Sequence, residues 1–259
     1  MPALLEIRNL SKTYKRSAKF ISSGYRQSLG PINFTLERGK TLSIIGESGS
    51  GKSSLAKIIG GLIPSTGGEI LVNGMPVSKM SRQKRCQTIR MIFQDPSNSL
   101  NPKTKIGRIL SAPLRLNTNF TETEIKQQIK IILSLVELLP DYLEFYPHML
   151  SPVQQHQVAL ARAMILNPDL IIADEILATL DISLRFKIVN LLLKIQEKTN
   201  VSFIFVAHNM NLVRHMSDQI LVMNHGLIVE NNSTEEIFNS PQTGISRHLL
   251  QNHQPDYRK

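Results

Sequence analysis

The stretch Gly46-Glu47-Ser48-Gly49-Ser50-Gly51-Lys52-Ser53 fits the pattern G-x-x-x-x-G-K-[ST] of a phosphate-binding loop. The apolar run Thr41–Ile45 before it predicts a buried strand, and residues 54–62 after it predict a helix. Glycines let the backbone curl so that successive N–H groups point at phosphate oxygens, and the helix N-terminus favours negative charge. A chance Gly- and Ser-rich turn is the alternative, but the strand–loop–helix context favours a phosphate site in an α/β fold.

The loop supplies a set of candidate ligands for a magnesium-bound nucleoside triphosphate. We expect the Lys52 ammonium to neutralise the terminal phosphates and the Ser53 hydroxyl to bind Mg²⁺. The complete set of nucleotide-binding candidates in this stretch is Gly46, Glu47, Ser48, Gly49, Ser50, Gly51, Lys52, Ser53 and Ser54.

A second apolar run, Leu170–Ala173, ends in two carboxylates, Asp174 and Glu175. We expect Asp174 to complete the Mg²⁺ shell. Because side chains alternate along a strand, Glu175 points differently, and it is the candidate general base for an attacking water. Taken alone, the pair reads more simply as acids at a solvated turn, but together with the phosphate loop the catalytic interpretation is favoured.

Strand and helix patterns alternate along the chain, which predicts an α/β fold with a mostly parallel core sheet. Thr121 and Glu124 form a capping box before an amphipathic helix, and Asn73-Gly74 predicts a type I′ hairpin turn. We expect one domain over residues 1–259, with an antiparallel β subdomain and a helical subdomain inserted at about 95–165. The other expected elements are strands at 4–10, 32–36, 69–72, 75–77 and 201–207, helices at 154–166 and 184–197, and a strand pair at 219–230.

Composition limits the functional classes. The chain has 259 residues, 41% hydrophobic, enough to bury a core, and a net charge of +10. Basic residues cluster at 12–26 and 79–90, but the chain has no Trp and only 5% aromatic residues, so no nucleic-acid partner is expected. The single cysteine, Cys86, excludes an internal disulfide. Because no run reaches about 20 apolar residues and no signal peptide is evident, we expect a cytoplasmic protein that meets a membrane surface.

Six features in order along the chain resemble ATP-binding-cassette (ABC) subunits. They are Tyr14, the loop 46–53, Gln94, the pair Asp174-Glu175, Asp181 and His208. The resemblance implies ATP and Mg²⁺ as cofactors. It further implies that Tyr14 stacks on adenine, that Gln94 bridges the Mg²⁺ site to membrane subunits, that Asp181 is the D-loop aspartate and that His208 contacts the γ-phosphate. An ordinary half-buried tyrosine, a polar loop residue and a structural histidine are the respective alternatives for Tyr14, Gln94 and His208.

The resemblance narrows to one branch of that family. Residues 97–102 and Tyr146-Pro147-His148 are similar to segments of oligopeptide and dipeptide transporter ATPases, and within them to F-type subunits associated with antimicrobial-peptide resistance. This implies a peripheral location on the cytoplasmic face of the inner membrane. The implied partners are a second, D-type ATPase in a heterodimer, two membrane permeases and, indirectly, a periplasmic binding protein.

One segment departs from the family. Its signature Leu-Ser-Gly-Gly-Gln, which presents a serine to the partner's γ-phosphate, is here Leu150-Ser151-Pro152-Val153-Gln154. Ser151 stays a nucleotide-binding candidate, but Pro152 offers no N–H and Val153 adds a branched side chain. Gln155 and Gln157 replace arginines, and Ile176, Ala178 and Asn209 are smaller departures. We therefore expect an asymmetric pair, in which this chain's loop hydrolyses ATP and its signature completes a slower partner site.

Three competing interpretations stay open. A non-transport ABC ATPase usually carries two cassettes, a coiled coil or zinc modules, none of which is seen in the sequence. A subunit that holds ATP without hydrolysing it fits the altered signature, but the retained Glu175 and His208 argue against it. An unrelated P-loop kinase leaves Gln94 and His208 unexplained.

Overall fold

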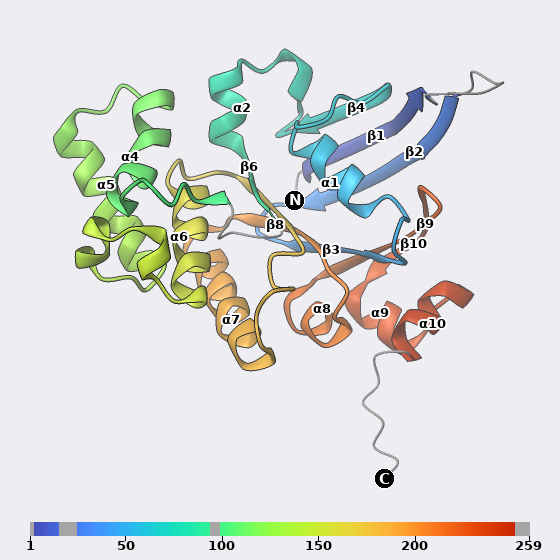
Figure 1. The fold of residues 1–259 in the computed structure, drawn as a ribbon. Coiled ribbons are helices and arrows are strands. Elements are labelled where there is room, and N and C mark those ends of the chain that lie inside the picture. Colours follow the sequence, from blue (N-terminus) through green and yellow to red (C-terminus); the bar gives the residue numbers. More distant parts are fainter. Residues whose placement is uncertain (1–2, 16–24, 94–98, 252–259) are drawn as a thin grey trace, which may run out of the picture. The chain divides into compact units, whose positions relative to one another are not determined.

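The structure is a computed structural model that describes residues 3–15, 25–93 and 99–251. These residues form two compact units, one made of residues up to 80 together with those from 204 onward, the other of residues 81–203. Figure 1 shows the helices and strands of both units, and their mixture confirms the predicted α/β class. The single domain with an inserted subdomain at about 95–165 stays a prediction.

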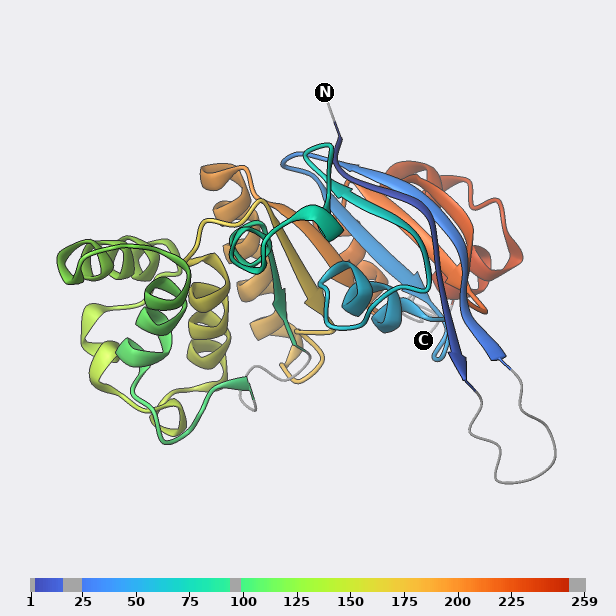
Figure 2. The same cartoon turned by 90° about the horizontal axis from the view of Figure 1, so that it is seen from above.

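The first unit carries an antiparallel sheet with the strand order β2-β1-β4-β5. Its strands are β1 Ala3–Lys15, β2 Tyr25–Glu37, β4 Gly67–Val72 and β5 Met75–Pro76. Figure 2 shows β1 and β2 running beside each other over most of their length. Asn73 and Gly74 between β4 and β5 have φ angles of 52° and 73°, so the predicted type I′ hairpin is confirmed. A 3₁₀ turn at Val77–Lys79 follows where we expected the strand to continue.

A second sheet of this unit positions the phosphate loop. Its order is β10-β9-β3-β8, with β3 at Thr41–Gly46, β8 at Ser202–Val206, β9 at Gln219–Asn224 and β10 at Leu227–Ser233. β3 runs parallel to β9, and all six β3 residues are buried. A run with no polar face is typical of a strand covered on both sides, as its apolar sequence predicts.

Four helices complete the first unit: α1 Lys52–Ile59, α8 Met210–Met216, α9 Thr234–Asn239 and α10 Gly244–Gln251. A cluster around Ile45, Val213 and Ile237 is almost fully buried, and Ile245 and Leu249 of α10 pack against it. Figure 1 shows α9 and α10 together beside β9 and β10. The segment 240–259 had no predicted structure, yet its part up to residue 251 contains this docked helix.

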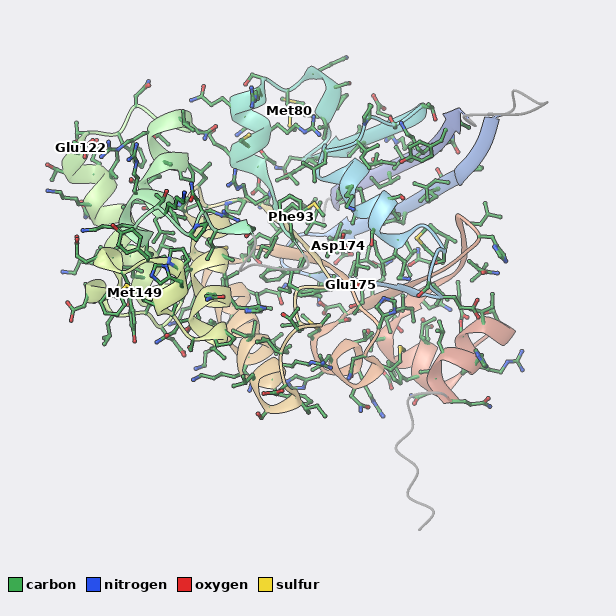
Figure 3. All side chains as sticks on the ribbon, in the orientation of Figure 1. Met80, Phe93, Glu122, Met149, Asp174 and Glu175 are labelled. Carbon is green, nitrogen blue, oxygen red and sulfur yellow. The ribbon has the colours of Figure 1, made fainter. Side chains whose placement is uncertain are left out.

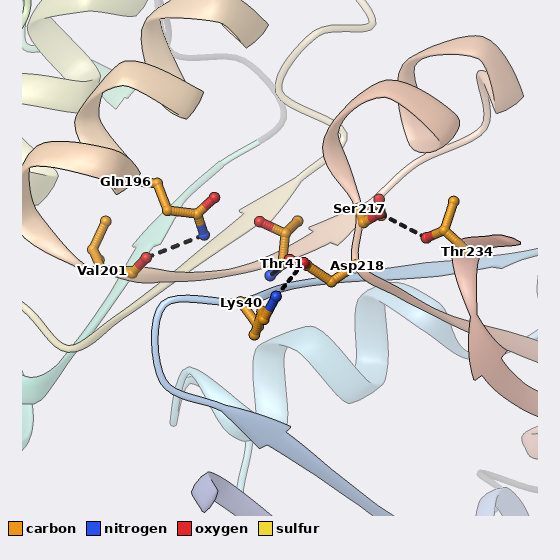
Figure 4. Close-up of polar contacts among 7 residues, drawn as sticks. All are labelled: Lys40, Thr41, Gln196, Val201, Ser217, Asp218 and Thr234. Carbon is orange, nitrogen blue, oxygen red and sulfur yellow. Dashed lines mark hydrogen bonds and ion pairs between the residues drawn. The ribbon is translucent and has the colours of Figure 1, made fainter. Parts of the chain in front are cut away.

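The start of β3 is fastened by Asp218 at the start of β9 (Figure 4). Its carboxylate accepts a hydrogen bond from the Thr41 N–H and one from the Lys40 ammonium, both at 2.8 Å. The Asp218 N–H in turn donates to the Thr41 carbonyl at 2.9 Å. These bonds fix the end of β3 opposite to the phosphate loop and hold the two parallel strands in register.

The second unit pairs β6 Ile89–Ile92 in parallel with β7 Leu170–Asp174, and β8 follows β7 in its strand order. Its helices are α2 Arg82–Thr88, α4 Ile106–Asn117, α5 Glu122–Leu135, α6 Pro152–Met164 and α7 Ile182–Thr199, with 3₁₀ turns at Pro140–Glu144 and Pro147–Met149. Thr121 and Glu124 cap α5 reciprocally, which confirms the predicted capping box. Within the described residues, no helix of either unit is both long and apolar enough to cross a bilayer.

Candidate functional site

The phosphate loop turns sharply where β3 ends. Gly46, Gly49 and Gly51 have φ angles of 147°, 81° and 102°, in the region that side chains disfavour. A Cβ on Gly46 would lie 2.1 Å from the Met223 carbonyl oxygen, so only glycine fits beneath β9. α1 begins at Lys52 with no side-chain cap at Gly51, which leaves the N–H groups of the first turn facing the loop.

Two side chains show that the loop is built around a polar ligand. The Lys52 ammonium is 5% exposed and donates to the carbonyls of Gly46 at 2.9 Å and Glu47 at 2.8 Å. The buried Ser50 hydroxyl oxygen has no hydrogen-bond partner among the described residues. Since buried polar groups are nearly always paired, Ser50 points to a ligand that completes its bonding. Loop and cation together suit a phosphate chain.

His208 lies at the same edge of the first unit's sheet as the phosphate loop. It follows β8, the neighbour of β3, and the Ala207 N–H donates to the Ile44 carbonyl at 3.3 Å. His208 is exposed, and Asn209 caps α8 by accepting from the Leu212 N–H at 3.1 Å. The contact of His208 with the γ-phosphate stays a prediction.

Tyr14, near the end of β1 in the same unit, is 41% exposed. The Lys12 ammonium lies 5.0 Å from the centre of its ring and donates to the Pro64 carbonyl at 2.6 Å. The ring thus combines an exposed surface with a cation–π contact. Adenine stacking on Tyr14 stays a prediction.

The acidic pair belongs to the second unit. Asp174 ends the fully buried strand β7 and is 6% exposed, whereas Glu175 is half-buried (Figure 3). Glu175 has a φ angle of 52°, a left-handed conformation that costs a non-glycine residue about 1–2 kcal/mol. Strained residues of this kind cluster at functional sites, where the surroundings hold them in place.

Gln94 lies outside the described residues, as do residues 95–98. The last described residue before it, Phe93, follows β6 and is 39% exposed. β6 and β7 are parallel, so Phe93 lies at the same sheet edge as Asp174. The assignment of Gln94 to the Mg²⁺ site stays a prediction from sequence.

The altered signature forms the start of α6. Ser151 is the N-cap and accepts from the Gln154 N–H at 3.4 Å, and Pro152 occupies the first helical position, where proline is well tolerated. Val153 is only 8% exposed, so its side chain packs inward and does not project from the helix end. The expectation that Pro152 and Val153 make this segment a poorer phosphate ligand stays a prediction. Gln157 is also buried and donates to the Val136 carbonyl at 2.9 Å.

Asp181 is the N-cap residue of α7 and is exposed, without a side-chain capping bond. The loop before it is held by Arg185, whose guanidinium donates to the carbonyls of Leu180 at 2.7 Å and Ala178 at 3.3 Å. Sequence analysis did not single out Arg185. The only feature of the sequence that could have identified Arg185 is its position one helical turn after Asp181, the predicted D-loop aspartate.

The assignment of Ser53 and Asp174 to Mg²⁺ stays a prediction; Ser53 belongs to the first unit, and Asp174 is a buried carboxylate of the second. The described part of the chain has no cluster of three or more His, Cys, Asp or Glu that could hold a metal alone. Mg²⁺ commonly binds through one or two carboxylates together with substrate phosphates and waters, so this donor set fits an ion that arrives with a nucleotide.

Comparison with known proteins places this geometry in a family. Residues 29–178 match the family model described as ABC transporter. The chain is 46% identical over 250 residues to the "Putrescine export system ATP-binding protein SapF" of Escherichia coli K12 and to the "Peptide transport system ATP-binding protein SapF" of Salmonella typhimurium, covering 96% of this chain and 93% of each relative. It also resembles the dimeric ATP-binding cassette MJ0796, solved with ADP and Pi, at 28% identity and a TM-score of 0.76 over 89% of this chain and 98% of that one.

A phosphate loop between a buried parallel strand and a helix defines a P-loop nucleoside triphosphatase. The family match covers more than half of the chain, and relatives match nearly all of it. The chain belongs to the ABC transporter family, as an ATP-binding subunit with ATPase activity. The predicted family, fold class and enzyme class are confirmed.

Proposed function

We propose that this chain powers a transporter that imports peptides across the bacterial inner membrane, in a system that confers resistance to antimicrobial peptides. The observation that supports this proposal most directly is the phosphate loop, in which the Lys52 ammonium and the Ser50 hydroxyl can bind a phosphate chain. Peptide transport is supported by the name of the Salmonella relative, and a peripheral position on the cytoplasmic face follows from the transporter context.

Each site residue takes a role in hydrolysis under this proposal. Lys52 and the loop amides bind the phosphates, and Tyr14 stacks on adenine. Ser53, Asp174 and Gln94 would hold Mg²⁺, which neutralises charge on the phosphates when bound. Glu175 polarises the attacking water, and His208 stabilises the γ-phosphate. Phosphoryl transfer needs mainly positioning and charge neutralisation, so these groups suffice.

A cationic hollow in the second unit is our candidate contact for a permease. It has a volume of about 400 Å³ and is lined by Arg90, Arg108 and Arg162, next to Ser99 and Asn101. Burial lowers the pKa of both Arg90 and Arg162, yet both stay charged at neutral pH. Arg162 donates to the Ser99 carbonyl at 2.7 Å and hydroxyl at 2.9 Å. This hollow complements an acidic or carbonyl-rich segment of a membrane subunit.

The full assembly that we propose contains a D-type ATPase partner and two permeases, with a periplasmic binding protein delivering substrate. The MJ0796 cassette is dimeric, which supports pairing of two cassettes. Ser151 and Asp181 would then face the nucleotide held by the partner's phosphate loop.

Putrescine export is the second candidate function, because an equally similar relative carries that name. The two candidates differ in substrate and in direction of transport, and both use the same ATPase. The test is a proteoliposome containing the whole complex, with ATP on the side of this subunit. We expect ATP to drive peptide movement toward the side that holds ATP. We expect no peptide movement away from that side. ATP-driven putrescine movement away from the ATP side would replace the peptide proposal.

A further inference from the structure

His156 in α6 links the signature segment to the segment that follows Glu175. Its ring is 5% exposed, with Nδ1 2.8 Å from the Pro152 carbonyl oxygen and Nε2 2.8 Å from the Ile176 carbonyl oxygen. Pro152 is the first residue of α6, and Ile176 directly follows Glu175. A single buried side chain therefore connects the start of α6 to Ile176, which lies 20 residues after His156 in the sequence.

Both partners of the ring are carbonyl oxygens, which only accept hydrogen bonds. A neutral histidine has one N–H, so one of the two contacts would then set a nitrogen lone pair against an oxygen. Which nitrogen donates depends on the tautomer, but both contacts are 2.8 Å, so the ring fixes the distance between the two carbonyls and thereby between their segments.

The segment from Ile176 to Leu180 is held at three carbonyls by two side chains, His156 and Arg185. The His156 ring contacts the carbonyl of Ile176, and the Arg185 guanidinium donates to the carbonyls of Ala178 and Leu180. The charged groups along the two segments that His156 joins are Asp174, Glu175, Asp181 and Arg185, and no other charged side chain lies in residues 152–158 of α6. Glu175 itself keeps a strained φ of 52°, a conformation that persists only when its surroundings fix it.

We propose that His156 is a positioning residue that fixes Glu175 for hydrolysis and couples it to the signature segment. The inference rests on the proposed function, in which Glu175 serves this chain's own ATP and Ser151 serves the partner's. A movement of the first turn of α6 on ATP binding would then pass through the His156 ring to the backbone next to Glu175. The signature segment, His156 and the segment after Glu175 all belong to the second unit, so the link runs within one compact unit.

The test compares His156→Leu, which keeps bulk but removes both donors, with His156→Gln, which keeps one side-chain amide donor. Steady-state kcat and KM for ATP are measured on the full chain assembled with its partner subunits. We expect His156→Leu to lower kcat tenfold or more at nearly unchanged KM, since small misplacements of a catalytic group cost about 10²-fold. His156→Gln should recover part of the rate. His148→Gln, an exposed histidine of the same unit, is the matched control.

A ring-¹⁵N correlation spectrum of the wild-type chain at neutral pH gives a readout that does not depend on a variant's folding. Both His156 nitrogens are expected to be hydrogen-bonded, and a ring nitrogen that is free in solvent would overturn the double contact. Unchanged kcat in His156→Leu would overturn the positioning role, as would a loss of rate explained wholly by a lower folded fraction. Glu175→Gln separates the two proposals. Normal ATP turnover in that variant would overturn the catalytic role of Glu175 in the proposed function, independently of the result for the His156 variants.

Discussion

Glu175 and Asp174 are neighbours with different surroundings, and this difference decides their proposed roles. Asp174 is buried at the end of β7, whereas Glu175 is half-buried with a left-handed backbone. A carboxylate that keeps contact with solvent can reach an attacking water, while a buried one suits a fixed cation.

Glu175→Gln should lower ATP turnover by about 10²–10⁴-fold, because it removes the general base. ATP affinity should be kept, since the phosphate loop is unchanged. Turnover and ATP affinity of the assembled complex are the measurements, with Glu197→Gln on the exposed face of α7 as control. Turnover close to wild type would locate hydrolysis in the partner's site.

Gly46 and Gly49 provide a matched pair within the phosphate loop. Both have positive φ, but an added Cβ meets the Met223 carbonyl at 2.1 Å at Gly46 and nothing within 4 Å at Gly49. Gly49→Ala should cost about 1–2 kcal/mol of unfolding free energy from backbone strain alone. Gly46→Ala should cost clearly more and abolish ATP binding. Urea unfolding and nucleotide titration check this, and equal costs would contradict it.

At the scale of single elements, periodicity and caps predicted most of what the structure shows. The α5 capping box, the Asn73-Gly74 hairpin and the buried strands β3 and β7 are all present. The short helices α8, α9 and α10 were not predicted, because stretches of six to eight residues are too short for a helical period to stand out. α10 depends on packing against the cluster around Ile45 and on the carboxylate of Glu230.

Glu230 on β10 fastens α10 through its carboxylate. It accepts from the Gln242 N–H at 3.0 Å, from the Thr243 N–H and hydroxyl at 3.2 Å each, and from the Ser246 hydroxyl. Burial raises the pKa of Glu230, but these hydrogen bonds outweigh burial and lower its pKa below the ordinary value of 4.5. A lowered pKa means that the ionised form stabilises the folded state above pH 4.5, and that this stability is lost as pH falls through the folded-state pKa.

Glu230→Gln should therefore cost about 1.5–3 kcal/mol at neutral pH, typical of hydrogen bonds to a charged group. It should also flatten the fall of stability on the acid side of pH 4.5. Chemical unfolding at pH 7 and pH 4, for this variant and for the exposed Glu235→Gln, checks both parts. A pH profile that is the same in wild type and in Glu230→Gln would contradict the assignment.

At the scale of the whole molecule, family and fold were predictable because six motifs stand in order along one chain. The conformation of the signature segment at residues 150–154 could not be predicted in the same way. Sequence alone indicated a poorer phosphate ligand at Pro152 and Val153, but a helix pattern does not say which way one residue at a helix start turns, and here the Val153 side chain is buried. Partners and substrate lie in other chains, so no residue of this one specifies them.

Pro152→Gly tests the predicted asymmetry of the ATPase pair. It restores a backbone N–H at the start of α6 while leaving the buried Val153 in place. Turnover at the partner's site should rise, measured with this chain's own site silenced by Glu175→Gln. Pro140→Gly, which changes a proline at the start of another helical turn, is the control. No rise in Pro152→Gly would mean that the altered signature does not limit the partner's site.

The tether of Lys52 to the carbonyls of Gly46 and Glu47 has a kinetic consequence. A loop whose cation already holds its own backbone keeps its curved shape without a nucleotide, so it does not have to fold around an incoming one. The association rate of ATP should then follow solvent viscosity and ionic strength, as an encounter between charged partners does. Its release should instead depend on how quickly the ammonium returns to those two carbonyls, which makes the empty loop a competitor for its own ligand.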